Sequence, residues 1–190
     1  MGRILIGIIL CLILLPIAVL AWLRLGHPPV AVADPPFPYE RQIVQIPLHA
    51  RMNREMPGNP PMQADEGTLN AGAQVYSDQC AVCHGFNGRP STLGPSMYPK
   101  APQFWVPRKG SSVLGVSNDP PGQTYWTVFN GIRLTGMPEF NNSLTDNEIW
   151  QVSLLLANAS KPLPPAAAAI VRGEIPPDTT PAAPAPPRKP

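Results

Sequence analysis

The chain has 190 residues, a net charge of +2 and 28 prolines. This length accommodates one domain with extensions, and the absence of any basic run argues against a nucleic-acid partner. Three cysteines do not make a disulfide framework, because Cys11 lies in an apolar run and cannot easily meet Cys80 or Cys83.

The N-terminal segment, residues 1–25, is a candidate membrane anchor. Ile4 to Leu23 carries no charge over 20 residues, a length that spans about 30 Å as a helix and so matches the hydrocarbon core of a bilayer. The apolar region of a cleaved signal peptide is shorter, about 7–15 residues. We therefore expect a retained transmembrane helix, with a cleaved signal peptide as the alternative.

Positive charges flank this apolar run on both sides, at Arg3 and at Arg24. The terminal amino group adds to Arg3, which favours a cytoplasmic N-terminus. The remainder of the chain is then expected on the extracytoplasmic, periplasmic side of a bacterial cell membrane.

Prolines concentrate on both sides of the central part of the chain. Nine lie between positions 28 and 61 and ten between 162 and 190, against eight in between. This distribution predicts a Pro-rich linker over residues 26–63 and a single domain over 64–160. Residues 39–56 hold more apolar side chains than a spacer needs, so we expect them to pack against the domain or against a partner protein.

The C-terminal segment, residues 161–190, is dominated by Pro and Ala. Such a composition predicts a disordered tail. Within it, residues 166–174 could form at most a weak helix.

Inside the central domain, the segments with a clear apolar periodicity are helical. A first helix is expected to begin near Asp65 or Thr68, and a short one to cover 124–130. The last helix begins with a capping box, in which Thr145 caps and Glu148 reaches back. No strand pattern competes, so the predicted fold class is all-α. The irregular stretch over 85–122 is long for such a domain, unless it wraps around a cofactor.

The pentapeptide Cys80-Ala81-Val82-Cys83-His84 has the form C-x-x-C-H, which is the attachment motif of c-type haem. Each thiol can form a thioether to a haem vinyl group, and His84 then binds the iron. A zinc half-site would need about four Cys or His ligands, and a thioredoxin-type pair would need a βαβ setting. The sequence offers neither, so chance is the remaining alternative to one covalently attached haem c.

A sixth iron ligand is predicted at Met137. It lies in the turn Thr135-Gly136-Met137-Pro138, 53 residues after His84 and just before the last helix. A thioether favours ferrous iron and raises the reduction potential. The rival ligands either lie in the linker or, for Met97, follow His84 too closely to reach the opposite haem face comfortably: His49, Met52, Met56, Met62 and Met97.

With these residues in place, residues 67–158 resemble the class I cytochromes c, small monohaem electron carriers of the membrane-anchored bacterial type. Gly72 and Tyr76 match the small residue and the aromatic that precede the first haem cysteine in that family. Trp150 matches an aromatic of its C-terminal helix. A tyrosine that often follows five residues later is Leu155 here, so the helix contact departs from the family pattern.

The resemblance implies further roles in cofactor binding. Pro95, after Gly94 in the haem loop, matches a proline whose carbonyl accepts the Nδ1–H of the proximal histidine. Thr135 lies where the family often hydrogen-bonds a haem propionate. Trp126 and Arg133 are other candidate propionate partners, with core or surface roles as the alternative.

The expected function is that of a one-electron carrier in a respiratory or dehydrogenase chain, without chemistry on a small-molecule substrate. Its partners would be redox proteins, in the membrane or the periplasm, that donate and accept the electron. A fixed haem subunit of a larger membrane oxidoreductase complex is the alternative. An enzyme or gas sensor with an open iron site would require that Met137 not bind the iron.

Overall fold

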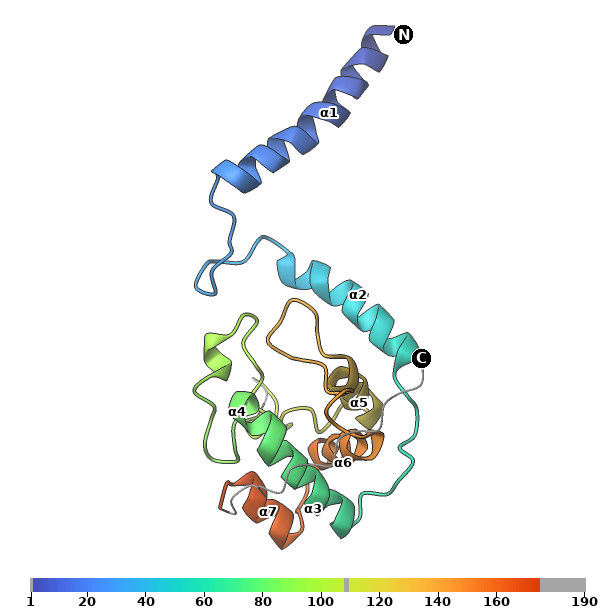
Figure 1. The fold of residues 1–190 in the computed structure, drawn as a ribbon, viewed down its shortest axis with the longest axis vertical. Helices are drawn as coiled ribbons and strands as arrows, with labels where there is room; N and C mark the ends of the chain where they lie inside the picture. The colour runs from blue at the N-terminus through green and yellow to red at the C-terminus, as the bar shows by residue number, and fades with distance from the viewer. Residues whose placement is uncertain (1, 108–109, 175–190) are drawn as a thin grey trace. The chain divides into compact units, whose positions relative to one another are not determined.

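The computed structural model describes residues 2–107 and 110–174 (Figure 1). Over these residues there is no strand, only two isolated bridges that join Phe86 to Arg89 and Pro107 to Leu114, so the all-α prediction is confirmed. The helical elements, including the π-helix η1 and the 3-10 helix η2, are α1 (Gly2–Leu25), α2 (Glu40–Glu55), α3 (Glu66–Val75), η1 (Tyr76–Cys80), α4 (Ala81–His84), η2 (Gly94–Ser96), α5 (Pro121–Asn130), α6 (Asp146–Ala157) and α7 (Pro165–Val171).

The chain divides into two compact units, residues 1–44 and 45–190. The first unit contains α1, which is long and apolar enough to cross a membrane. None of its residues is buried by other parts of the protein. A helix that is apolar all round and covered by nothing is suited to lipid.

The second unit is built on the contact between α3 and α6 (Figure 1). Asp65 caps α3 by accepting the backbone N–H of Thr68, at 2.8 Å. The capping box of α6 forms as predicted between Thr145 and Glu148. Both caps satisfy N–H groups that have no partner inside the helix.

The backbones of α3 and α6 meet at Gly72. A Cβ atom at this position would lie 2.3 Å from the carbonyl oxygen of Gln151, so only glycine allows the approach. Tyr76, Ile149 and Leu155 are fully buried around the contact. Leu155 thus fills the position where the related family often has a tyrosine.

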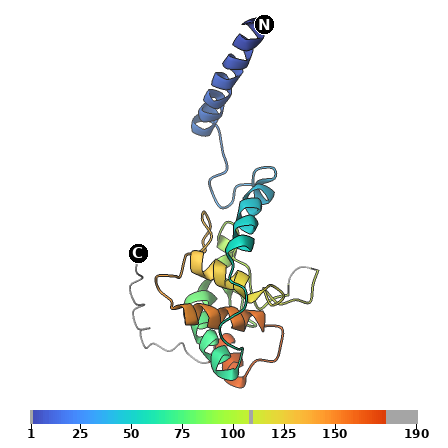
Figure 2. The same ribbon diagram turned by 90° about the vertical axis from the view of Figure 1, so that its right-hand side faces the viewer.

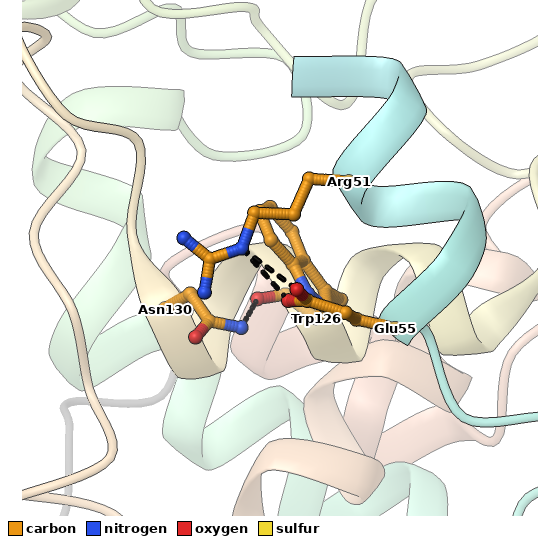
Figure 3. A network of polar contacts seen from close by, with 4 residues as sticks. All are labelled: Arg51, Glu55, Trp126 and Asn130. Carbon is orange, nitrogen blue, oxygen red and sulfur yellow. Dashed lines mark hydrogen bonds and ion pairs between the residues drawn. The ribbon is translucent and has the colours of Figure 1, made fainter. Parts of the chain in front are cut away.

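The predicted linker contains a helix that belongs to the haem-motif unit. From residue 45 onward α2 packs on α5, with Met52 only 5 % exposed. The Trp126 indole N–H donates to the Glu55 carboxylate at 3.1 Å, and Arg51 pairs with the same carboxylate at 2.8 Å (Figure 3). The prediction of a linker is therefore wrong for residues 45–55, which form a packed helix. The packing that was expected for residues 39–56 occurs within residues 45–55.

The predicted disordered tail is also wrong in its first part. Helix α7 packs on α3 (Figures 1 and 2), and Ala167 and Val171 are almost fully buried. The Ala167 N–H donates to the Asn70 side chain at 3.0 Å, and the Val171 carbonyl accepts the Asn87 N–H at 2.7 Å. Residues 175–190 of the predicted tail lie outside the described residues.

The packing of α2 predicts a stability effect at Met52. Met52→Ala should lower the free energy of unfolding by about 2–5 kcal/mol, because a buried methionine leaves a cavity. Ile46→Ala, on the same helix but 70 % exposed, is the matched control and should change it by less than about 0.5 kcal/mol. Chemical denaturation measures both, and equal effects would mean that α2 does not pack on α5 in solution.

Candidate functional site

The C-x-x-C-H motif lies at the end of a continuous helical segment. Helix α3 passes through the π-helical turn η1 into the short helix α4. A π-helical turn changes the direction in which the following side chains point, and such turns are frequent at functional sites. Cys80 and His84 are buried here, and Cys83 is half-buried.

Cys80 does not have the character of the reactive thiol of a redox pair. Burial, with the neighbouring Cys83 and Asp78, raises the pKa of the Cys80 thiol to about 12. Dithiol catalysts instead lower the pKa of one thiol to expose a thiolate. Among the described residues no group of three or more His, Cys, Asp or Glu side chains comes together to hold a metal ion, so the zinc alternative gains no support either.

His84 is held by a backbone carbonyl and an aromatic ring. Its Nδ1 lies 2.7 Å from the carbonyl oxygen of Pro102, and its ring stacks on Phe104 with centroids 4.2 Å apart. Burial lowers the pKa of His84, and the hydrogen bond to Pro102 opposes this only in part. The ring is therefore neutral at neutral pH, with Nε2 available as a metal ligand.

The expectation that Pro95 accepts this hydrogen bond is wrong. Pro95 lies in η2, which packs closely against the haem motif, because a Cβ atom on Gly94 would lie 2.2 Å from the Cys83 carbonyl oxygen. The chain then loops out and returns, with the Ala101 N–H bound to the Gly94 carbonyl at 3.1 Å. This returning segment of the loop places Pro102 beside the imidazole of His84.

Gln103 is a site residue that the sequence did not indicate. Its side-chain amide donates to the carbonyls of Cys83 and Ala101, at 3.1 and 3.2 Å. Its oxygen accepts the N–H of Ser91 at 2.8 Å. Gln103 therefore ties both ends of the loop to the motif, a role that depends on the path of the loop and leaves no signal in the sequence.

Tyr76 stabilises the motif through a buried hydrogen bond and an aromatic contact. Its side chain is fully buried, its hydroxyl donates to the Gly85 carbonyl at 2.5 Å, and its ring meets Trp105 edge-on at 5.6 Å. The hydrogen bond spans from the start of η1 to the residue after His84. It fixes the length of the turn on which all three motif residues lie.

Met137 lies in a turn that closes on itself. Gly131 opens the turn with φ of 64°, and a Cβ atom there would meet the Met137 carbonyl at 2.9 Å. The Ile132 N–H donates to this same carbonyl at 3.1 Å. Only glycine fits at the opening, because it alone adopts this conformation freely and lacks the obstructing Cβ.

Thr135 stabilises the same turn. Its hydroxyl donates to the Ile132 carbonyl at 2.7 Å and accepts the Met137 N–H at 3.1 Å. A hydroxyl has one proton, and here that proton is used within the turn. A bond from Thr135 to a haem propionate stays a prediction that requires this internal bond to open.

The motif and the turn line one cavity of about 480 Å³ with mainly apolar walls. Cys80, Cys83, His84 and Met137 all line it, together with Val152 and Leu156 of α6. The size is that of a small-molecule or cofactor site. Two thiols, a neutral imidazole and a thioether around an apolar cavity are the donor set that a covalently bound haem requires, so the residues fit the group.

Of the rival sixth ligands only Met97 lines this cavity. Met52 is buried instead against α5, where its sulfur lies 3.9 Å from the Thr127 hydroxyl. Trp126 donates to Glu55 and Arg133 is exposed. Neither of the last two lines the cavity, so the propionate role considered for them gains no support.

The tyrosine bond yields a test. Tyr76→Phe should lower the free energy of unfolding by about 1–3 kcal/mol, because the buried Gly85 carbonyl loses its partner. Tyr39→Phe, at a tyrosine that is 73 % exposed, should have no measurable effect. Thermal unfolding of the two variants against the parent measures this, and an unchanged Tyr76→Phe would contradict the buried bond.

Comparison with known proteins agrees with this site. Residues 67–154 match the family model described as cytochrome C oxidase, cbb3-type, subunit III. No curated protein and no solved structure matches the chain. The matched range contains the C-x-x-C-H motif and Met137. Residues 67–154 are therefore similar to the cbb3-type cytochrome c family, and the chain is a membrane-anchored electron carrier with covalently bound haem c.

Proposed function

We propose that His84 and Met137 are the axial ligands of one haem c, that Cys80 and Cys83 hold it by thioether bonds, and that the protein carries single electrons between redox proteins. The observation that carries this proposal is the single apolar cavity that all four side chains line. The two ligands lie 53 residues apart in the sequence. A cavity that joins them is what a six-coordinate, closed iron site needs.

The residues around the proposed haem have separate roles. When bound, haem c supplies a one-electron couple between ferric and ferrous iron. The Pro102 carbonyl orients His84 and increases its basicity as a ligand. Met137 would hold the iron on the other side with a soft thioether, which favours the reduced state. The mainly apolar walls of the cavity would favour the less charged ferrous site. With both axial positions filled, no substrate binds the iron, so we assign no enzymatic reaction to the chain.

The proposal extends to location and partners. The charge of Arg3 and the amino terminus supports an N-terminus on the cytoplasmic side. The haem domain then faces the extracytoplasmic space, on a single-pass anchor formed by α1. There it would exchange electrons with membrane-bound or periplasmic members of a respiratory or dehydrogenase chain.

Replacement of the sixth ligand tests the proposal. In Met137→Ala the far-red absorption band from sulfur-to-iron charge transfer should disappear, and carbon monoxide should bind the reduced protein. The reduction potential should fall by a substantial part of the ~0.8 V range that axial ligands set. Met62→Ala, outside the cavity, is the control and should leave all three unchanged. Survival of the band in Met137→Ala would mean that another residue is the ligand.

A second candidate function is a fixed haem subunit of a membrane oxidase. It is favoured by the matched family model, whose description is that of an oxidase subunit. The two candidates differ in what the anchored chain is bound to. We expect the full chain, extracted from its native membrane in mild detergent, to migrate as a single haem-bearing chain. A stable complex with other subunits in fixed stoichiometry would reverse the choice.

A further inference from the structure

Met97 makes a contact that links the two sides of the haem cavity. It is half-buried and lines the cavity beside Pro99 and Pro102. Its sulfur lies against Gly136, because a Cβ atom built on Gly136 would be 2.8 Å from Met97 Sδ. Met97 therefore touches the residue that directly precedes the proposed ligand Met137.

The segment that carries Met97 is fixed to the histidine side of the cavity. The Ser91 hydroxyl donates to the Val82 carbonyl at 2.6 Å, and Gly94 packs on the Cys83 carbonyl. On the far side of Met97, Gln103 binds the Cys83 carbonyl. The position of Met97 is thus set by the same segment that carries His84.

The turn that carries Met137 is held less firmly. Its internal hydrogen bonds join Ile132, Thr135 and Met137 to one another. Leu134, at the tip, is 91 % exposed and has φ of 62°, a conformation that is uncommon for residues other than glycine. The tip gains almost no burial, so contacts from outside the turn matter for its position.

We propose that Met97 is a positioning residue that latches the Met137 turn closed over the haem. The proposal rests on the ligation of iron by Met137. In it the Met97 side chain fills the space that Gly136 leaves empty, and it keeps water and small ligands from entering at that side. An unbranched thioether can follow an irregular backbone surface. Met97 acts through this packing and is not itself the ligand.

Imidazole binding to the ferric full-length protein measures the latch, because imidazole must displace the Met137 sulfur. Met97→Ala should bind imidazole about tenfold more tightly than the parent, since the turn opens more easily without the packed side chain. Met97→Leu retains a side chain of similar volume and should stay within about twofold. Leu93→Ala removes an apolar side chain from the same loop, outside the cavity, and should equal the parent.

A second variant tests the contact from its other side. Gly136 has a backbone conformation open to other residues, since its φ lies outside the left-handed region. In Gly136→Ala the new methyl group should displace the Met97 thioether and tighten imidazole binding in the same direction as Met97→Ala. In both variants the sulfur-to-iron band should also disappear at a lower temperature than in the parent.

The outcomes separate the two proposals. A parent with the sulfur-to-iron band and a Met97→Ala variant with unchanged imidazole affinity would refute the latch and leave ligation by Met137 standing. Equal effects of Met97→Leu and Met97→Ala would refute it too, because packing would not be the cause. A parent without the band would refute ligation by Met137 and the latch together.

Discussion

The close approach of α3 and α6 at Gly72 is the constraint on which the rest of the haem domain depends. Because α3 runs through η1 into α4 without a break, its position on α6 also sets where Cys80 and His84 lie. The same helix α6 contributes Val152 and Leu156 to the wall of the cavity. One backbone contact without an intervening side chain therefore fixes the attachment motif relative to an apolar wall. A larger residue at position 72 would push the attachment motif and the apolar wall of α6 apart.

Two segments outside the matched family range brace this arrangement. Helix α7 covers α3 and binds the loop after the motif through the Val171 carbonyl. From residue 45 onward α2 covers α5, where Glu55 and Trp126 meet (Figure 3). Just after α2, the Pro57 carbonyl packs against Gly122 of α5. A domain of this size buries a limited core by itself. The two flanking segments enlarge this core, α7 by packing on α3 and α2 by packing on α5.

The sequence was informative where chemistry or capping is local. The C-x-x-C-H motif, the Gly-Met-Pro segment and the capping box of α6 each occupy a few neighbouring residues, and the capping box forms as predicted. Pro102 and Gln103 were missed because the loop before them decides which carbonyl meets His84, and that path depends on the packing of Gly94. Helix α2 was not predicted because Pro47 and the prolines around it indicated a spacer, and because the burial of Met52 against α5 depends on the fold. The role of α7 was not predicted because its Pro/Ala composition is typical of a disordered tail. Its three buried side chains become buried through packing that the sequence pattern does not show, mainly on α3.

The two segments that carry the proposed ligands differ in how firmly they are held, and this difference bears on electron transfer. A carrier works best when its ligands keep the same positions in both oxidation states, because any movement must accompany every electron. On the histidine side, Pro102, Gln103 and Tyr76 bind a segment that is continuous with a helix. On the methionine side, a short turn with an exposed tip relies on its own hydrogen bonds and on Met97. With the proposed ligation, exchange of a ligand should therefore begin at Met137 and leave His84 in place. This order follows from the distribution of contacts, and under the proposed ligation the rim beside Gly136 is where the fold would control access to the iron.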